Sequence, residues 1–328
     1  MEKTFNLVVD EGEKGLRLDK WLASKIDGCS RVKIQRLIKS GFVLDANDEV
    51  VADQKLAVNV GDEYSVRIPE DEVVSSAKPE NIPLDILYED DDIIVVNKPA
   101  GMVVHQGVGV SSGTLVNALL YHCNGHLSSI GAEAGRQGIV HRLDKDTSGA
   151  MLACKTDVAH LEMYKQFANH SVKREYYALL WGIPNPVSGR IEKNIARNPH
   201  SRQEMTVVVD GGKPAITNYE TLTVFSGSKF KPLALVKCVL ETGRTHQIRV
   251  HMASIGTPIL GDVVYGNPSR HITQVENEDV RSLLMGISRQ MLHSKNIEFI
   301  HPITKEKMKF ETKLPEDMQK VINFFKGE

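Results

Sequence analysis

The hydrophobic and polar positions of this chain follow two periods. Apolar residues recur at roughly helical spacing over residues 18–26 and 30–41, which predicts two amphipathic helices. Ser30 and Gly41 flank the second helix as a typical N-cap and a typical C′ residue. Residues 42–68 form short β-prone runs separated by polar turns. The beginning of the chain is therefore predicted to form a small α/β domain of two helices followed by strands.

Beyond residue 83 most apolar runs are typical of strands. The stretch over 86–99 contains two apolar runs around Asp90–Asp92 and predicts a β-hairpin. Strands follow one another instead of alternating with helices, which favours an α+β domain with a large mixed, mainly antiparallel β-sheet over a doubly wound fold. Helices are expected over residues 114–123, 157–170 and 244–256, and strands over 138–143, 150–156, 174–182, 205–212, 215–225 and 233–241.

One stretch between these two regions is typical of a linker. Residues 70–83 read EDEVVSSAKPENIP, with two prolines, paired serines and no sustained periodicity. We therefore divide the chain into a small N-terminal domain, residues 1–76, and a large C-terminal domain, residues 77–328.

Charge is unevenly distributed along the chain. The formal net charge of −2 over 328 residues excludes a protein that grips nucleic acid through global positive charge. Residues 14–41, however, contain eight lysines and arginines against two aspartates, a local charge of +6. Lys33, Arg36 and Lys39 recur at nearly every third position, opposite the apolar residues of the predicted helix. Such a stripe indicates either contact with a phosphate backbone or an ordinary solvated helix face.

Other patterns exclude further classes of protein. The start of the chain lacks an apolar leader segment, and no stretch approaches the ~18 apolar residues that cross a bilayer, so we expect a cytoplasmic protein without membrane contact. The four cysteines lie far apart without a C-x-x-C pair, which argues against disulfides and thiolate zinc sites. His246 and His251 are five residues apart, which is the wrong spacing for two metal ligands on one helical face.

The segment GIVHRLDKDTSGAMLACKT, residues 138–156, contains the first candidate chemistry. Asp144 lies where a predicted strand ends and a polar turn begins. One interpretation is structural, with Asp144, Asp146 and Ser148 stabilising the turn through side-chain hydrogen bonds. A calcium loop is excluded because Lys155 stands where such a loop needs a bidentate glutamate.

The segment ETGRTHQIRVHMASIGTPILGDVVYG, residues 241–266, contains the second. A helix that begins near Thr245 places His246 and Arg249 on one face and the apolar residues on another. The apolar face is then expected to dock on the sheet, which leaves Arg249 free to point into a cleft.

HRLDKDTSG together with LETGRTHQIRVH resembles the RluA/RluD family of RNA pseudouridine synthases. NKPAGMVVHQ, REYYAL and PILGDVVYG are similar to further blocks of that family, in the same order. LRLDKWLA and SRVKIQRLIKSGFV resemble an S4-type RNA-binding domain, although the turn VLDANDEVV replaces the usual V-x-V-N-G and adds negative charge. The resemblance covers nearly the whole chain.

The resemblance implies roles for individual residues. Asp144 corresponds to the catalytic nucleophile, and Arg249 to the basic residue that pairs with it. Tyr176, selected over Tyr177 by the register of the block, corresponds to the tyrosine that packs on the target base and helps to remove its C5 proton. Arg142 corresponds to an arginine that takes part in flipping the uridine out. The expected RNA-binding residues are Arg142, His141, Arg31, Lys33, Arg36 and Lys39.

Elementary chemistry agrees with these roles. A carboxylate attacks only when it is ionised, and a buried one needs a cation beside it to stay so. A base must leave its stack before an enzyme can act on it, and an aromatic surface can receive it. The isomerisation oxidises nothing and takes no group from a donor, so no cofactor and no metal are expected.

The resulting hypothesis is a monomeric enzyme that converts specific uridines to pseudouridine in RNA. The S4-like domain and the order of the blocks favour large-subunit (23S) ribosomal RNA, either free or within a pre-ribosomal particle. Two alternatives stay open at this point: an RNA-binding ribosome-assembly factor built on a synthase scaffold, and a synthase that acts on transfer RNA.

Overall fold

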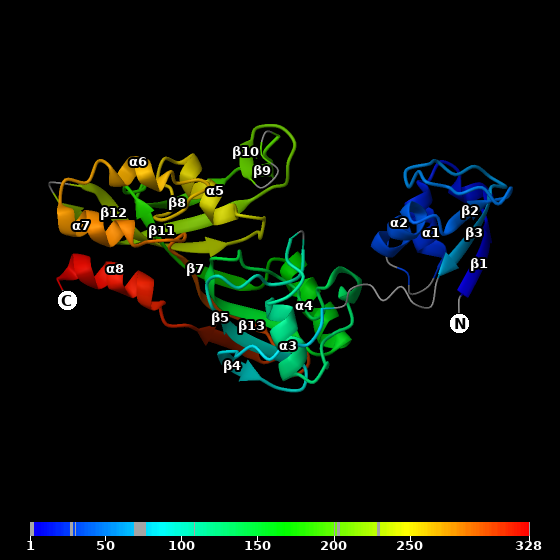
Figure 1. Cartoon of the computed structure of the whole chain (residues 1–328), viewed down its shortest axis with the longest axis horizontal. Helices are drawn as coiled ribbons and strands as arrows, with labels where there is room; N and C mark the ends of the chain where they lie inside the picture. The colour runs from blue at the N-terminus through cyan, green and yellow to red at the C-terminus, as the bar shows by residue number, and fades with distance from the viewer. Residues whose placement is uncertain are drawn as a thin grey trace. The chain divides into compact units, whose positions relative to one another are not determined.

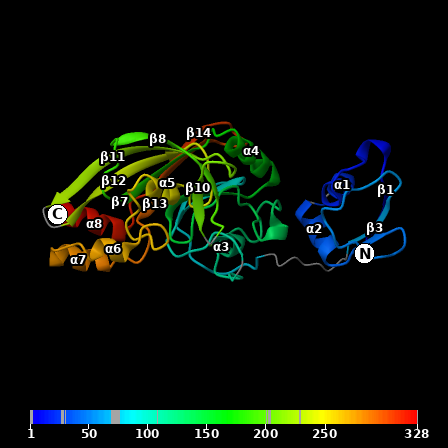
Figure 2. The ribbon, with the colours of Figure 1, turned by 90° about the horizontal axis from the view of Figure 1, so that it is seen from above.

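The chain forms two compact units, residues 1–74 and 75–328. The computed structural model describes residues 3–26, 29, 31–68, 77–107, 109–199, 201, 204–227 and 230–327, without the side chains of residues 3, 32, 33, 36 and 133. Figure 1 and Figure 2 show the elements of each unit from two directions. Within the described residues, no helix has both the length and the apolar composition needed to cross a membrane.

In its described residues, the small unit packs two α-helices on a three-stranded antiparallel sheet. The strands pair in the order β1-β3-β2, so the last strand lies in the middle. Trp21, Leu22, Ile34 and Leu37 are fully buried in its core, which closes between the helices and the sheet. The elements are β1 (Lys3–Val8), η1 (Glu11–Glu13), α1 (Leu18–Lys25), α2 (Arg31–Lys39), β2 (Val43–Asp45) and β3 (Glu63–Ile68).

Helix α2 confirms two predictions made from its sequence pattern. Its apolar residues Ile34, Leu37 and Ile38 are fully buried. Gly41 follows the helix with φ of 77°, and the Phe42 N–H donates to the Leu37 carbonyl at 2.9 Å, which is the hydrogen bond of a helix that ends on a left-handed C′ glycine. The predicted N-cap Ser30 lies outside the described residues.

The large unit is built on a nine-stranded sheet, as far as the chain is described. The strands pair in the order β4-β5-β6-β13-β7-β12-β11-β8, with β14 on the end of β13. All these pairs are antiparallel except β6 with β13, so the predicted mixed, mainly antiparallel sheet is confirmed. The strands are β4 (Ile86–Glu89), β5 (Ile93–Lys98), β6 (Ser148–Cys154), β7 (Lys173–Trp181), β8 (Ser188–Glu192), β11 (Ile216–Gly227), β12 (Phe230–Leu240), β13 (Leu292–Ile300) and β14 (Lys307–Glu311).

Helices cover both faces of this sheet, and β9 and β10 form a separate hairpin. On one face Leu180 packs with residues of α3 and α5; on the other Leu179 and Trp181 pack with residues of α7 and α8. The alternation along β7 therefore serves two cores at once. The remaining elements are α3 (Leu115–His122), η2 (Ala132–Ala134), α4 (Asp157–Ala168), β9 (Asn194–Arg197), β10 (Met205–Val208), α5 (Gln247–Ser254), α6 (Pro268–Ile272), α7 (Glu278–Met285) and α8 (Glu316–Lys326).

Two local predictions are wrong. Residues 138–143 do not form a strand: Ile139 makes a single bridge to Ala153, and the His141 ring, not a backbone carbonyl, accepts the Leu152 N–H at 3.0 Å. Helix α5 begins at Gln247 instead of near Thr245, because His246 has a left-handed backbone with φ of 56° that an α-helix cannot contain. Both departures occur where side chains enter the cavity described next.

Candidate active site

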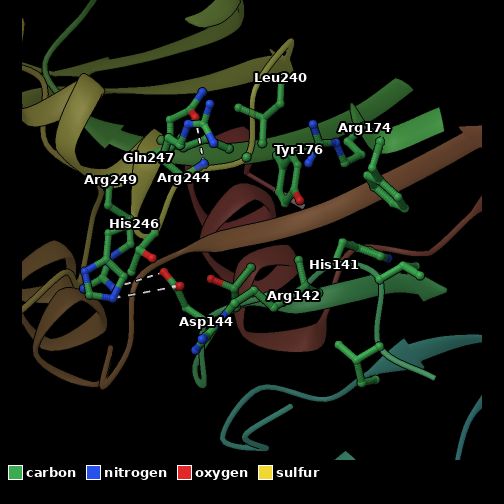
Figure 3. Close-up of a pocket in the computed structure, with 18 of the residues that line it drawn as sticks. His141, Arg142, Asp144, Arg174, Tyr176, Leu240, Arg244, His246, Gln247 and Arg249 are labelled. Carbon is green, nitrogen blue, oxygen red and sulfur yellow. Dashed lines mark hydrogen bonds and ion pairs between the residues drawn. The ribbon is translucent and has the colours of Figure 1, made fainter. Parts of the chain in front are cut away.

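A cavity of about 520 Å³ opens on the large unit. Its walls come from residues 139–144, β7, the segment 243–246 with the start of α5, and α4. Figure 3 shows the side chains that enter it. The structure thus brings together five residues that the sequence singled out from distant segments: His141, Arg142, Asp144, Tyr176 and Arg249.

Asp144 and Arg249 form an ion pair in this cavity (Figure 3). Arg249 Nη1 donates to Asp144 Oδ2 at 3.1 Å. The Arg249 side chain is 6% exposed and that of Asp144 18%, so the arginine is embedded while the carboxylate still faces the cavity. The geometry therefore presents an accessible carboxylate beside a buried guanidinium.

A second aspartate fixes the orientation of Arg249. Asp262, which is fully buried, accepts two hydrogen bonds from Arg249, from Nε at 2.7 Å and from Nη2 at 3.0 Å. The backbone N–H groups of Val264 and Tyr265 also donate to Asp262. This bidentate pairing uses one edge of the guanidinium and leaves Nη1 for Asp144. The Tyr265 ring lies 5.1 Å from the guanidinium carbon of Arg249.

His246 also lies near Asp144. Its Nε2 lies 3.9 Å from Asp144 Oδ1, and its Nδ1 lies 2.8 Å from the Tyr265 hydroxyl, which accepts the Met205 N–H. Burial lowers the pKa of His246, although the neighbouring Asp144 opposes this effect. A neutral ring with its Nε2 hydrogen toward Asp144 satisfies all of these contacts.

Hydrogen bonds fix the backbone of the turn that carries Asp144, residues 144–147. The Thr147 N–H donates to the Asp144 carbonyl at 3.1 Å and closes the turn. Arg289 Nη1 donates to the Asp146 carbonyl at 3.0 Å, and Gln290 donates to the Thr147 hydroxyl at 3.3 Å. Arg289 also pairs with Asp317 at the start of α8. Contacts from the C-terminal segment therefore fix the backbone beside Asp144.

Lys98, the last residue of β5, forms a hydrogen bond with the same turn. It is 1% exposed and donates to the carbonyls of Pro99, Met102 and Lys145 at 2.8, 2.8 and 3.0 Å. Burial lowers the pKa of Lys98 to about 7. The three carbonyl acceptors nevertheless match the three hydrogens of the ammonium form. Lys98 thereby ties the end of β5 to the turn of Asp144.

Tyr176 lies on the cavity face of β7 and Tyr177 on the opposite face. Tyr176 is 5% exposed and lines the cavity, whereas Tyr177 packs against the core that holds α7 and α8. Burial raises the pKa of Tyr176, and Arg174 and the Ser294 hydroxyl oppose it in part. The register favoured at the sequence level thus selects the tyrosine that faces Asp144.

Arg142 and His141 occupy different depths. Arg142 is exposed, and its Nη1 lies 3.3 Å from Nε2 of the buried His105, whose Nδ1 lies 2.7 Å from the Gln106 carbonyl. His141 stacks on Phe167 with ring centroids 4.9 Å apart. Burial and the nearby Arg174 cation lower the pKa of His141 to about 3, so the ring is neutral near pH 7.

The cavity lining is strongly basic. Among its described residues Asp144 is the one carboxylate, against five arginines at positions 136, 142, 174, 244 and 249. Arg136 and Arg142 are exposed at the rim. A chain of net charge −2 therefore concentrates positive charge at this opening, as expected for a site that receives a polyanion.

The predicted RNA-binding residues of the small unit, at positions 31, 33, 36 and 39, belong to α2. Arg31 is bound to the buried Asp19, with Nη2 at 2.9 Å from Oδ2, while its side chain stays 42% exposed. Lys39 is exposed at the end of α2. The side chains of Lys33 and Arg36 lie outside the described residues. An RNA-binding role for these four residues stays a prediction.

Several site residues were not singled out from the sequence. Asp262, Tyr265 and Arg174 lie within the quoted blocks PILGDVVYG and REYYAL. A GD pair followed by an aromatic residue was the available signal for Asp262, but nothing local identifies Arg249 as its partner. In the described part of the chain, no group of three His, Cys, Asp or Glu side chains is arranged to hold a metal ion.

The fold is that of the pseudouridine synthases. The structure titled Human RNA Pseudouridylate Synthase Domain Containing 1 matches with a TM-score of 0.52 and 24% identity, over 76% of this chain and 97% of that chain. Human RNA Pseudouridylate Synthase Domain Containing 4 matches with a TM-score of 0.51 and 22% identity, over 74% and 93% of the two chains. At such identities the likeness concerns the fold alone.

Sequence similarity then shows the family. Residues 92–254 match the RNA pseudouridylate synthase family. Ribosomal large subunit pseudouridine synthase D of Zymomonas mobilis is 44% identical over 318 residues, 96% of each chain. The uncharacterized RNA pseudouridine synthase YlyB of Bacillus subtilis is 42% identical over 318 residues, 97% of each chain. The chain belongs to the RluA/RluD-type RNA pseudouridine synthases, which are isomerases of uridine in RNA.

Proposed function

We propose that this enzyme isomerises specific uridines of large-subunit ribosomal RNA, with Asp144 as the nucleophile. The single observation that carries the proposal is the accessible Asp144 carboxylate on Arg249, in a cavity lined by Tyr176 and five arginines. The choice of RNA rests on relatives named ribosomal large subunit pseudouridine synthase D, in Zymomonas mobilis and in Neisseria meningitidis, the latter 41% identical over the whole of this chain.

The proposed reaction uses Asp144 twice. The flipped uridine enters with its base against Tyr176, and the Asp144 carboxylate attacks C1′ while the electron pair of the N1–C1′ bond leaves with the uracil. The base turns, C5 bonds to C1′, and Asp144 departs as a carboxylate. That carboxylate takes the proton from C5 and releases it to water, N1 takes a proton from water, and Asp144 ends ionised as it began. Burial raises the pKa of Tyr176, so its neutral phenol packs on the base instead of accepting the proton.

Asp144→Asn tests the nucleophile. The amide keeps the shape of the side chain but cannot attack, so pseudouridine formation in large-subunit RNA should fall by at least about 1,000-fold. The measurement is mass spectrometry of nucleosides from RNA treated with purified enzyme. Asp91→Asn, an exposed aspartate in the β4–β5 turn, is the matched control and should keep full activity. Persistence of the modification in Asp144→Asn would refute the assignment.

The same variant separates this proposal from the two alternatives. In cells that carry only Asp144→Asn, normal assembly of large subunits without the modification shows that assembly does not require catalysis. Defective assembly in cells that lack the whole protein, together with normal assembly in cells with Asp144→Asn, would show a scaffold role; defective assembly in both would show that catalysis is required. Modification of purified transfer RNA in preference to ribosomal RNA would redirect the substrate assignment.

We further propose that the small unit binds RNA through α2. The support is a helix whose apolar residues Ile34, Leu37 and Ile38 are buried and whose other positions carry Lys33, Arg36 and Lys39. Replacing these three by Ala should weaken RNA binding and lower the slope of log Kd against log salt by about 2 to 3. A control that removes exposed lysines of the large unit, Lys307, Lys309 and Lys320, should leave the slope nearly unchanged. An unaltered slope in the α2 variant would show that this helix does not face RNA.

A further inference from the structure

Arg174 is a buried cation of the cavity without a carboxylate partner. It lies on β7 two residues before Tyr176, on the same face of the strand, and is 7% exposed. No ion pair joins it to any described acidic side chain, and its Nε atom is buried without a hydrogen-bond partner. The other buried arginines differ: Arg249 pairs with two aspartates, and Arg289 pairs with Asp317.

The surroundings hold the Arg174 guanidinium in one place. Its central carbon lies 5.4 Å from the centroid of the Phe167 ring. Its Nη1 atom lies only 2.6 Å from the position that a Cβ on Gly243 would occupy. An aromatic face and a residue without a side chain therefore leave space for this group and little else.

A buried guanidinium without a partner is costly, so a fold retains one mainly when something else supplies the partner. The cavity contains no second carboxylate among its described lining residues. The unpaired Nε–H of Arg174 therefore points to an acceptor that arrives with the substrate.

The order of side chains along the cavity indicates which acceptor. Arg174 and Tyr176 lie two residues apart on one face of β7 and line the cavity together with Asp144, with which Arg174 forms no ion pair. Figure 3 shows Tyr176 between the other two. With the sugar at Asp144 and the base on Tyr176, Arg174 lies at the edge of the base remote from the sugar.

We propose that Arg174 donates a hydrogen bond to a carbonyl oxygen of the flipped uracil and stabilises the negative charge of the base when the N1–C1′ bond breaks. The electron pair of that bond leaves with the uracil, and the resulting anion is delocalised from N1 onto its two carbonyl oxygens. This inference rests on the proposed function and adds a further catalytic residue to it. A backbone phosphate is the less favoured ligand, because phosphates suit the exposed Arg136 and Arg142 at the rim.

Arg174→Met is the first test, in the full-length chain with its RNA. Methionine fills the space on Phe167 without charge, so kcat should fall by about 100-fold, the loss typical of one donor to a developing anion, while KM changes little. Tm should stay the same or rise, because an unpaired buried charge is removed. A loss of Tm with unchanged kcat in the folded fraction would assign Arg174 a structural role and overturn the proposal.

RNA that contains 5-fluorouridine at the target gives the sharper test. Fluorine stabilises the uracil anion, so a better leaving group depends less on Arg174. The single-turnover loss of 5-fluorouridine should then differ between the native chain and Arg174→Met by about 10-fold or less, against about 100-fold for uridine. Equal ratios for the two bases would show that Arg174 binds RNA without stabilising the leaving group.

Two further variants complete the design. Gly243→Ala should displace the Arg174 guanidinium and reproduce part of the loss of activity. The losses with uridine and with 5-fluorouridine should differ less in this variant than in Arg174→Met. Arg270→Met removes an exposed arginine of α6 outside the cavity and should change neither ratio. If the native chain fails to isomerise the RNA at all, the proposed function is wrong; if it succeeds and the two ratios agree, only the role of Arg174 is wrong.

Discussion

Each of the two units contains a fully buried aspartate that binds arginine, and the two arrangements differ in one respect. In the small unit Asp19 accepts hydrogen bonds from Arg17, Arg31 and Gln35. In the large unit Asp262 accepts two from Arg249 alone, together with two backbone N–H groups. The backbone donors take the place of a second arginine.

That difference decides what the arginine can still do. The arginines of Asp19 are 37% and 42% exposed, and their pairing links α1 to the start of α2. Arg249 is 6% exposed and keeps one N–H group for Asp144. Asp19 thus joins two helices of the small unit, whereas Asp262 positions the Arg249 guanidinium toward Asp144. The experiments below test this contrast.

Asp262→Asn should have the largest effect. The amide cannot accept both guanidinium hydrogen bonds, so Arg249 loses its orientation and a buried cation loses a charge partner. We expect kcat to fall by about 100-fold or more and the free energy of unfolding of the large unit to fall by about 3 kcal/mol. Stopped assays on RNA and denaturant titrations measure the two changes. Full activity would show that Asp144 alone orients Arg249.

Asp19→Asn should destabilise without affecting catalysis. The small unit is expected to lose about 2 kcal/mol, because three donors share this carboxylate. Native-state hydrogen exchange of the α1 and α2 amides in the full chain measures this loss. Turnover of a short RNA that carries only the target loop should stay as in the native chain. A fall in kcat on that short RNA would contradict the contrast between the two aspartates.

The stabilisation that the ionised Asp19 gives to the small unit should also depend on pH. Burial alone would raise the pKa of Asp19, but hydrogen bonds from Arg17, Gln35 and Arg31 outweigh burial and lower the pKa from 3.8 to about 2. Since the folded pKa is below the unfolded one, the stabilisation is complete above pH 4 and is lost as pH falls toward 2. The difference in stability between the native chain and Asp19→Asn should therefore shrink over that interval. A constant difference would contradict the shift.

Arg31→Lys should have the smallest effect. Arg31 is largely at the surface and shares Asp19 with two other donors, so an ammonium can replace one of its hydrogen bonds at a cost of less than about 1 kcal/mol. Arg249→Lys is the matched change in the large unit. A lysine there cannot reach Asp262 bidentately and Asp144 together, so activity should fall by about 100-fold. If Arg31→Lys and Arg249→Lys had equally small effects, the contrast between Asp19 and Asp262 would be wrong.

Local patterns predicted most of the elements correctly because helical and strand periods are properties of the backbone. The apolar face of α2, the β4–β5 hairpin and the helix over 157–168 could each be predicted within one window of sequence. The segment 138–143 has a local apolar run but does not pair as a strand. The Leu152 N–H of β6 donates to the His141 ring instead of to a backbone carbonyl of this segment. Periodicity carries no information about such a side-chain substitute.

The sequence by itself determined the family, the mixed and mainly antiparallel sheet, and the candidate residues Asp144, Tyr176 and Arg249, because these depend on short runs of neighbouring positions. The tertiary structure decided how they combine. It turns Tyr176 and not Tyr177 toward Asp144, pairs Arg249 with Asp262, and leaves Arg174 unpaired. Arg249 and Asp144 are 105 positions apart in the sequence, and a contact at that separation depends on the order in which the strands pair in the sheet.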